Sequence, residues 1–193
     1  MARTESTMAP LGMELPSFAL PDVTSGESVS PADLERAPAL LVVFLCNHCP
    51  YVKHIRPALA AFARDYQPRA LALVAISSND PEAHPEDGPD GMREEAKTAG
   101  YTFPYLYDES QEVAKAFGAA CTPDFFLFDG ERRLVYRGQF DGSRPGNDVP
   151  VTGQDLRKAT ETVLAGGRPS EDQTPSLGCN IKWKAGNAPP WFG

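Results

Sequence analysis

The sequence predicts an α/β domain in which helices flank a central mixed sheet. An unbroken apolar run from Ala39 to Leu45 is typical of a strand buried on both faces. A second apolar run, from Ala70 to Ile76, follows a helical segment, and this strand–helix–strand order implies parallel pairing. Asp129-Gly130 lies between two further apolar segments and predicts an antiparallel hairpin, so the sheet should be mixed.

The N-terminal part is predicted to add a small hairpin to this sheet. Residues 1–11 are expected to form a flexible lead-in, and Leu15 to Val23 contains prolines that suit an edge strand. A Ser25-Gly26 turn and Val29 indicate that this strand pairs with the chain that follows it. Ser30 to Leu34 is predicted to be a short capped helical turn.

An amphipathic helix is predicted directly after Cys49. Pro50 suits the first turn of a helix, where a missing N–H costs nothing. Pro57 is expected to kink the helix. Apolar residues recur at three- and four-residue steps and form one stripe: Val52, Ile55, Leu59, Phe62 and Tyr66.

An insertion, Asn79 to Asp108, is predicted before the second core helix. Its first part, Asn79 to Asp90, is rich in acidic residues and prolines and is expected to be a surface loop. The remaining expected elements are helices at Met92–Ala99, Glu109–Phe117 and Asp155–Leu164, an extended segment at Thr102–Tyr107, and strands at Phe125–Phe128 and Leu134–Arg137. Residues 167–193 differ in composition and are predicted to be a tail packed back on the domain, with Ile181 and Trp183 on an edge strand.

Two cysteines, Cys46 and Cys49, lie where the buried strand gives way to the helix. The first turn of a helix has unpaired N–H groups and the positive end of the helix dipole. Both stabilise a thiolate and lower a cysteine pKa from about 8.5 to roughly 3.5–7.5. The position therefore predicts a reactive sulfur.

Two motifs give the chain a resemblance to known proteins. The first is the run from Asn47 to Ile55, and the second is the run from Cys121 to Asp129, which begins Cys-Thr-Pro. Together they resemble the thioredoxin-like superfamily, and in particular its peroxiredoxin-like branch of redoxins, or AhpC/TSA-like proteins. The resemblance extends from about Gly12 to about Leu164 and implies a thioredoxin-like domain at residues 12–166.

The roles of the cysteines depend on how the first motif is aligned. In one register, Cys46 and Cys49 are the nucleophile and the resolving thiol of an ordinary Cys-x-x-Cys pair, with His48 before the second sulfur. In the register that we prefer, Cys49 is the nucleophile, because Phe44, Lys53 and Pro57 then match thioredoxin without a gap. Cys46 or Cys121 would be the resolving thiol.

The same resemblance implies a substrate-binding site, and it leaves Cys179 as the least favoured candidate for the resolving thiol. Thr122-Pro123 resembles the loop in which a proline after a cis peptide bond faces the nucleophile. Thr122, Pro123, His48 and Pro50 are therefore the predicted substrate-binding residues, and Cys179 is a distant third candidate for resolution. The acidic residue that thioredoxin carries in its buried strand corresponds to Val43, so no proton acceptor for the resolving thiol is evident.

The predicted function is that of a thiol-disulfide oxidoreductase, with two alternatives. A peroxiredoxin needs Pro-x-x-x-Thr-x-x-Cys, which neither Cys46 nor Cys49 completes, so efficient peroxidase activity is doubtful even if Arg137 or Arg144 approaches the site. The second alternative is a non-enzymatic carrier of Cu(I) or Zn²⁺ that uses cysteines and a histidine. The main prediction includes no metal and no cofactor.

Composition limits the partners that we expect. The net charge is −8 and the pI is about 4.9, which disfavours nucleic acid and anionic membranes. No apolar leader or spanning segment is visible, so a cytoplasmic location is expected. The expected partners are protein or small-molecule disulfides and thiols, with thioredoxin or glutathione as the reductant.

Overall fold

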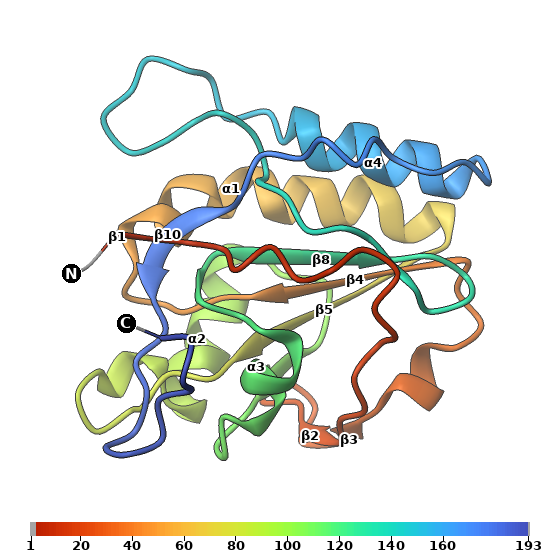
Figure 1. Cartoon of the computed structure of the whole chain (residues 1–193). Helices are drawn as coiled ribbons and strands as arrows, with labels where there is room; N and C mark the ends of the chain where they lie inside the picture. Colours follow the sequence, from red (N-terminus) through yellow and green to blue (C-terminus); the bar gives the residue numbers. More distant parts are fainter. Residues whose placement is uncertain (1–2, 193) are drawn as a thin grey trace.

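A five-stranded mixed sheet forms the centre of the computed structural model, which describes residues 3–192 (Figure 1). Its strand order is β6-β5-β4-β8-β9. The β4–β5 and β5–β6 pairs are parallel, and the β4–β8 and β8–β9 pairs are antiparallel, which confirms the predicted mixed sheet. The five strands are β4 (Ala39–Phe44), β5 (Leu71–Ser77), β6 (Tyr105–Tyr107), β8 (Asp124–Phe128) and β9 (Leu134–Tyr136).

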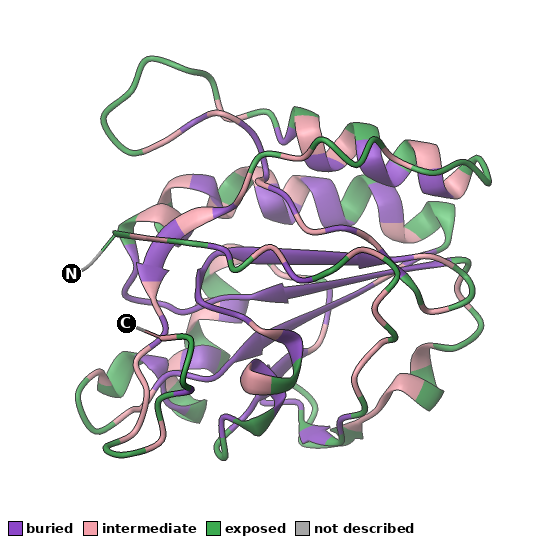
Figure 2. Ribbon diagram, in the orientation of Figure 1, coloured by how far each residue is buried: buried purple, intermediate pink, exposed green. Residues whose placement is uncertain are grey.

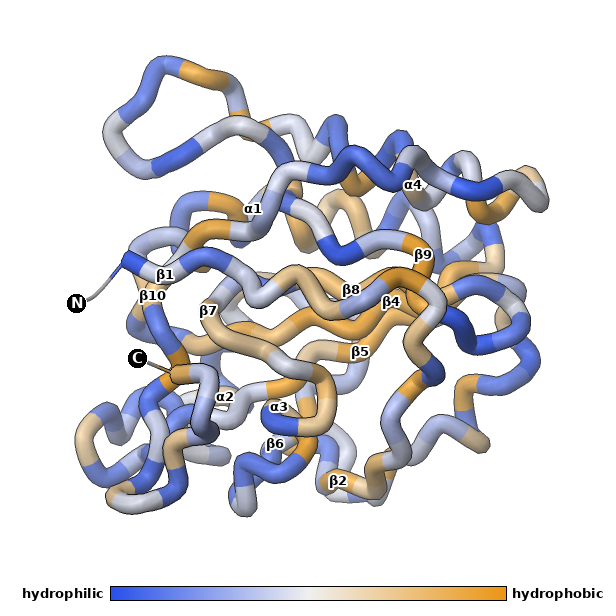
Figure 3. The backbone as a smooth tube through the Cα atoms, in the orientation of Figure 1, coloured by the Kyte–Doolittle hydropathy of each residue, from blue (hydrophilic) through white to orange (hydrophobic). Residues whose placement is uncertain are grey.

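The central strand β4 is buried on both faces because helices cover each side of the sheet (Figure 2). Leu41 and Val43 face the core shared with α1 (Pro50–Tyr66) and α4 (Gln154–Leu164). Leu40, Val42 and Phe44 face the opposite core, which contains α3 (Glu112–Phe117). Figure 3 shows the apolar β4, β5 and β8 as a continuous hydrophobic band between these layers.

Helix α1 begins and packs as its sequence pattern predicts. Pro50 is its first residue and Pro57 lies inside it. The predicted stripe residues are all buried against the sheet. Burying an aliphatic or aromatic side chain of this size contributes about 1.5–3 kcal/mol, so this stripe fixes the helix and its N-terminus relative to β4.

The insertion is more regular than predicted. A short 3₁₀ helix, η3 (Pro85–Asp87), interrupts the expected loop, and α2 (Pro89–Ala99) begins three residues before the predicted helix. Pro89 is the first residue of α2, where a missing N–H costs nothing, and this favours the early start. Helix α3 is three residues shorter than predicted and ends at Gly118, whose φ of +65° suits glycine.

The N-terminal hairpin is present but short. β2 (Leu20–Pro21) pairs antiparallel with β3 (Ser28–Val29), so most of the expected Leu15–Val23 strand is irregular. The 3₁₀ helix η1 (Pro31–Leu34) follows, with Ser30 and Asp33 forming a capping box. Another 3₁₀ turn, η2 (Gln67–Arg69), joins α1 to β5.

The chain termini meet in a second, three-stranded sheet, which changes two expectations. β10 (Leu177–Asn180) pairs antiparallel with both β1 (Arg3–Glu5) and β7 (Cys121–Thr122). Part of the expected flexible lead-in is therefore a strand, while Met1, Ala2 and Gly193 lie outside the described residues. The tail strand precedes Ile181 and Trp183, which instead pack in the α3-side core. Within residues 3–192, no helix is both long and apolar enough to cross a membrane.

Candidate active site

The site lies where the start of α1, the turn between β7 and β8, and strand β10 come together. Cys49 is the N-cap residue of α1. The Thr122–Pro123 peptide bond is cis, as the resemblance of the Cys-Thr-Pro motif implies. β10 pairs with β7 in a register that places Cys179 opposite Thr122. These three elements bring residues from distant parts of the sequence around one sulfur atom.

The Cys49 sulfur has two close neighbours. Its Sγ lies 2.7 Å from Cys179 Sγ and 3.2 Å from the carbonyl oxygen of Thr122. The Thr122 carbonyl can accept a hydrogen bond from Cys49 only while that thiol is protonated. The Cys49 residue is fully buried in the resting structure.

The surroundings of Cys49 stabilise its thiolate. Hydrogen bonds from the Cys179 and Cys46 thiols hold the pKa of Cys49 far below its usual value. Burial opposes this shift, but the backbone N–H groups of Val52 and Cys179 add to it. Val52 is in the first turn of α1, so the start of the helix contributes to the lowered pKa.

The surroundings of Cys46 and Cys121 raise the pKa of each thiol, in contrast to those of Cys49. Cys46 Sγ lies 3.0 Å from Thr122 Oγ1, and burial raises its pKa, as do its hydrogen bond to Cys49 and the charge of Asp87. Burial and the charge of Asp124 raise the pKa of Cys121, whose Sγ lies 3.6 Å from the carbonyl oxygen of Pro123. Both cysteines are therefore thiols at neutral pH.

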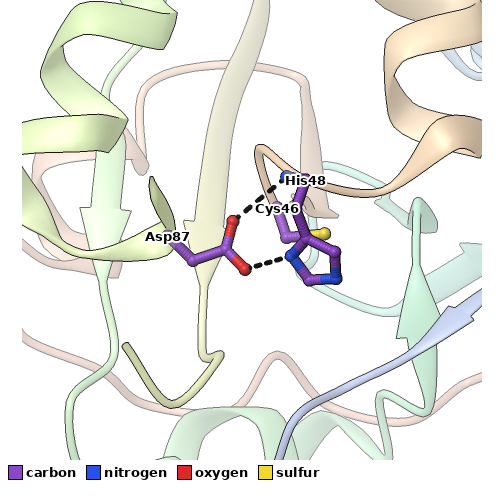
Figure 4. Close-up of side chains that lie close together, drawn as sticks. All are labelled: Cys46, His48 and Asp87. Carbon is purple, nitrogen blue, oxygen red and sulfur yellow. Dashed lines mark hydrogen bonds and ion pairs between the residues drawn. The ribbon is translucent and has the colours of Figure 1, made fainter. Parts of the chain in front are cut away.

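A buried histidine–aspartate pair lies beside Cys46 (Figure 4). His48 Nδ1 is 2.5 Å from Asp87 Oδ2, and the backbone N–H of His48 also donates to this carboxylate. Burial alone would raise the pKa of Asp87. Hydrogen bonds from His48, from the Asn79 side chain and from the backbone N–H of Asn47 outweigh this effect and lower the pKa below its usual value, so the carboxyl is ionised. A carboxylate only accepts hydrogen bonds, so His48 carries a proton on Nδ1. The sequence analysis missed Asp87, which is one of several acidic residues in the insertion.

The other nitrogen of His48 faces a different environment. His48 Nε2 is buried and has no hydrogen-bond partner among residues 3–192. The ring of His84 stacks on that of His48 with 3.9 Å between centroids. Cys46 Sγ, a His48 nitrogen and an Asp87 oxygen lie within 4.8 Å of one another, but a metal there would compete with the His48–Asp87 bond.

The predicted substrate-binding residues are only partly gathered in one place. Thr122 touches the Cys46 sulfur through its hydroxyl and the Cys49 sulfur through its carbonyl. Pro123 lines a small pocket together with Tyr51, Leu177 and Arg144. His48 is buried on the Asp87 side, and Pro50 is exposed at the helix start.

The two arginines considered for peroxide binding are engaged elsewhere. Arg137 donates to the carbonyl of Ala9 and to the side chain of Gln173. Arg144 lines the pocket, but its guanidinium donates to the carbonyls of Asp141 and Ser143. The structure therefore shows no arginine–sulfur contact at Cys49 within the part of the chain that it describes.

Comparison with known proteins places this geometry in a family. Residues 11–137, more than half of the chain, match the AhpC/TSA family. The chain belongs to the AhpC/TSA family. A search of curated proteins found no match.

Solved structures resemble the chain over a longer stretch than the family match. An uncharacterised conserved protein from Geobacillus kaustophilus is 52% identical with a TM-score of 0.93, over 95% of this chain and 97% of that one. A hypothetical protein from Sinorhizobium meliloti 1021 is 55% identical with a TM-score of 0.93, over 95% of this chain and 100% of that one. A thiol:disulfide interchange protein of the thioredoxin family from Chlorobium tepidum TLS is 20% identical with a TM-score of 0.62, over 81% of this chain and 98% of that one. The fold is thioredoxin-like, and the family and its structural neighbours support a thioredoxin-like redox function.

Proposed function

We propose that this AhpC/TSA family member is a thiol-disulfide oxidoreductase with Cys49 as its nucleophile. The observation that carries the proposal is the position of Cys49 at the start of α1, where thiols and backbone N–H groups lower its pKa. Of the four cysteines, Cys49 is the one whose pKa is lowered, while the pKa of each of the others is raised. A thiolate is the form of cysteine that attacks disulfides.

The reaction follows from this charge distribution. The Cys49 thiolate attacks one sulfur of a disulfide R–S–S–R′, so that a Cys49–S–S–R bond forms and R′–S⁻ leaves. A second thiol of the protein then attacks Cys49 Sγ and releases R as a thiol. The sequence predicts Cys46 or Cys121 for this second step, and thioredoxin or glutathione as the reductant that restores both thiols.

Access to Cys49 favours small substrates in the first step. The sulfur is buried, but the residues beside it reach a small pocket. Tyr51 is in the first turn of α1, and Pro123 directly follows the carbonyl that contacts Cys49; both line this pocket. A small disulfide such as oxidised glutathione is therefore the first substrate to test.

A comparison of disulfide with peroxide as the oxidant tests the proposed function. Reduced wild-type protein and Cys49→Ser are each mixed with oxidised glutathione or with hydrogen peroxide, and free thiols are counted over time. We expect loss of thiols with the disulfide in the wild type and none in the variant, with peroxide slower because no arginine of residues 3–192 contacts the sulfur. Faster oxidation by peroxide would support the peroxidase alternative. Retention of bound Cu or Zn by unreactive protein would support the metal-carrier alternative.

A further inference from the structure

We propose that Cys179, in the tail strand β10, is the resolving thiol of this site and forms an intramolecular disulfide with Cys49. This inference rests on the proposed function and names the second thiol of the same reaction. Residue 179 lies outside the segment, 11–137, that matches the family. The family match therefore assigns no role to Cys179.

The first support is the distance between the two sulfur atoms. Cys49 Sγ and Cys179 Sγ are 2.7 Å apart, and a disulfide bond is about 2.03–2.05 Å long. Cys46 also hydrogen-bonds Cys49, but its sulfur is held by the Thr122 hydroxyl at 3.0 Å. Cys121 Sγ is directed to the carbonyl of Pro123.

The second support is the way in which the backbone fixes Cys179. β10 is the middle strand of its sheet, with β1 on one side and β7 on the other. Cys179 is paired with Arg3 across one edge and with Thr122 across the other. This pairing holds the Cys179 backbone from both sides, with its sulfur in contact with Cys49 Sγ.

Gly178 allows the close approach of β10 to the cis-proline turn. A Cβ atom at Gly178 would lie 2.0 Å from the carbonyl oxygen of Thr122 and 2.6 Å from its carbon. Any larger residue would push β10 away from β7. The residue before Cys179 is thus the one that permits the sulfur–sulfur contact.

The third support is that Cys179 is kept protonated mainly by Cys49 itself, whereas Cys46 and Cys121 are kept protonated mainly by burial. The largest cause that raises the pKa of Cys179 is its hydrogen bond to Cys49, ahead of burial and of the charge of Cys49, and the charge of Lys182 lowers it. When Cys49 enters a mixed disulfide, its negative charge and its acceptor sulfur are lost. Cys179 then becomes easier to deprotonate at the moment when its thiolate is needed.

Cys46 and Cys121 gain less. Burial is the largest cause that raises their pKa values, and it remains when Cys49 is consumed, as do the charge of Asp87 on Cys46 and the charge of Asp124 on Cys121. The hydrogen bond to Cys49 and the charge of Cys49, which also raise the pKa of Cys46, come after burial. Cys46 therefore acts as a hydrogen-bond donor to the Cys49 thiolate, and Cys179 acts in resolution.

The resolving step balances without a further reactant. Cys179 Sγ attacks Cys49 Sγ in the mixed disulfide, a Cys49–S–S–Cys179 bond forms, and the S–S bond between Cys49 and R breaks, with R–S⁻ as the leaving group. The proton of Cys179 goes to the departing R–S⁻, which leaves as a thiol. The protein pair is oxidised by two electrons and the substrate disulfide is reduced by two electrons.

Trapping the intermediate tests this role. Reduced wild type, Cys179→Ser and the control Cys46→Ser are each treated with one equivalent of oxidised glutathione, quenched with an alkylating agent and mapped by peptide mass spectrometry. We expect a Cys49–Cys179 disulfide without bound glutathione in the wild type. Cys46→Ser should form the same pair, more slowly, because Cys46 supports the Cys49 thiolate but does not resolve it. In Cys179→Ser we expect loss of resolution, with glutathione retained on Cys49.

The outcomes separate this inference from the proposed function. Glutathione release by Cys179→Ser at the wild-type rate, or a Cys46–Cys49 or Cys49–Cys121 disulfide in the wild type, would overturn the role of Cys179 while leaving Cys49 as the nucleophile. Absence of any adduct on Cys49 in all three proteins would overturn the proposed function itself. The wild-type map does not depend on the folding of a variant, so it decides the pairing even if Cys179→Ser is unstable.

Discussion

The surroundings of Cys49 favour its thiolate, whereas those of the other three cysteines favour the protonated thiol. The neighbours of Cys49 donate hydrogen bonds to the sulfur, whereas burial and negative charge act on Cys46 and Cys121. A depressed pKa favours the ionised form at lower pH. The charge on this one sulfur, and not the number of cysteines, defines the site.

The depressed pKa of Cys49 predicts a thiolate below neutral pH. An ordinary thiol of pKa near 8.5 is ionised to well under ~1% at pH 6. Thiolate absorbance near 240 nm, measured on reduced wild type and on Cys49→Ser between pH 9 and pH 5, should retain one thiolate at pH 6 in the wild type and none in the variant. Identical titrations of the two proteins would contradict the assignment.

Asp124 is a buried carboxyl at the start of β8 with an unusual protonation state. Burial raises its pKa to about 7, against hydrogen bonds from Ser6, Ser176 and the backbone of Ala120. Its Oδ1 has no partner among residues 3–192. The folded state therefore holds a proton between pH 4 and pH 7 that the unfolded state releases.

This raised pKa predicts that Asp124→Asn changes the pH dependence of stability. Because folding takes up a proton at Asp124, its contribution is fully present below pH 4 and is lost as the pH rises to about 7. The loss is on the order of 4 kcal/mol for three pKa units. Urea unfolding at pH 4.5 and pH 8 should show a smaller decline in Asp124→Asn than in the wild type. Parallel declines would rule out Asp124 as the source.

Local sequence patterns predict the elements β4 and α1. The residues that contact Cys49 are brought there by segments far apart in the sequence, which such patterns do not reveal. Seven apolar residues followed by a proline and an apolar stripe define a strand and a helix without further information. The register of β10 on β7 has no local signal, so Cys179 was ranked last although it contacts Cys49. Asp87 has no local signal either, because only its contact with His48 in the folded chain distinguishes it from the other acidic residues of the same loop.

The packing of β10 on β7 predicts that Gly178→Ala separates the two sulfurs. A Cβ at residue 178 would overlap the Thr122 carbonyl, so β10 must shift and carry Cys179 with it. Formation of the Cys49–Cys179 disulfide, followed by quenched mass spectrometry, should be slower in this variant than in the wild type. Gly142→Ala is the matched control, since the nearest atom to its Cβ is Val149 Cγ1 at 4.0 Å. Equal rates in both variants would show that the contact does not limit disulfide formation.

At the scale of the whole molecule, the tail is an integral part of the domain. Its strand pairs with β1 and β7, and Ile181 lies in the core beside α3. Beyond the strand, the backbone N–H of Lys182 donates to the Asn79 side chain, and that of Lys184 donates to Gln111. The sequence indicated a tail that packs back, but the aromatic residues alone could not identify which strand it joins.

Deletion of residues 167–193 is therefore expected to destabilise the domain. The loss of buried Ile181 and half-buried Trp183, with the hydrogen bonds to Asn79 and Gln111, should lower the free energy of unfolding by at least ~3 kcal/mol. Chemical unfolding followed by circular dichroism measures this change. An unchanged midpoint would mean that the tail is not part of the cooperative unit.

The most direct test of the account is the order in which the four cysteines react. Fully reduced protein is treated at pH 6 with less than one equivalent of iodoacetamide, and each cysteine peptide is quantified by mass spectrometry. Cys49 should be alkylated before Cys46, Cys121 and Cys179, because it alone is a thiolate at that pH. Alkylation of another cysteine first, or equal and slow alkylation of all four, would contradict Cys49 as the nucleophile.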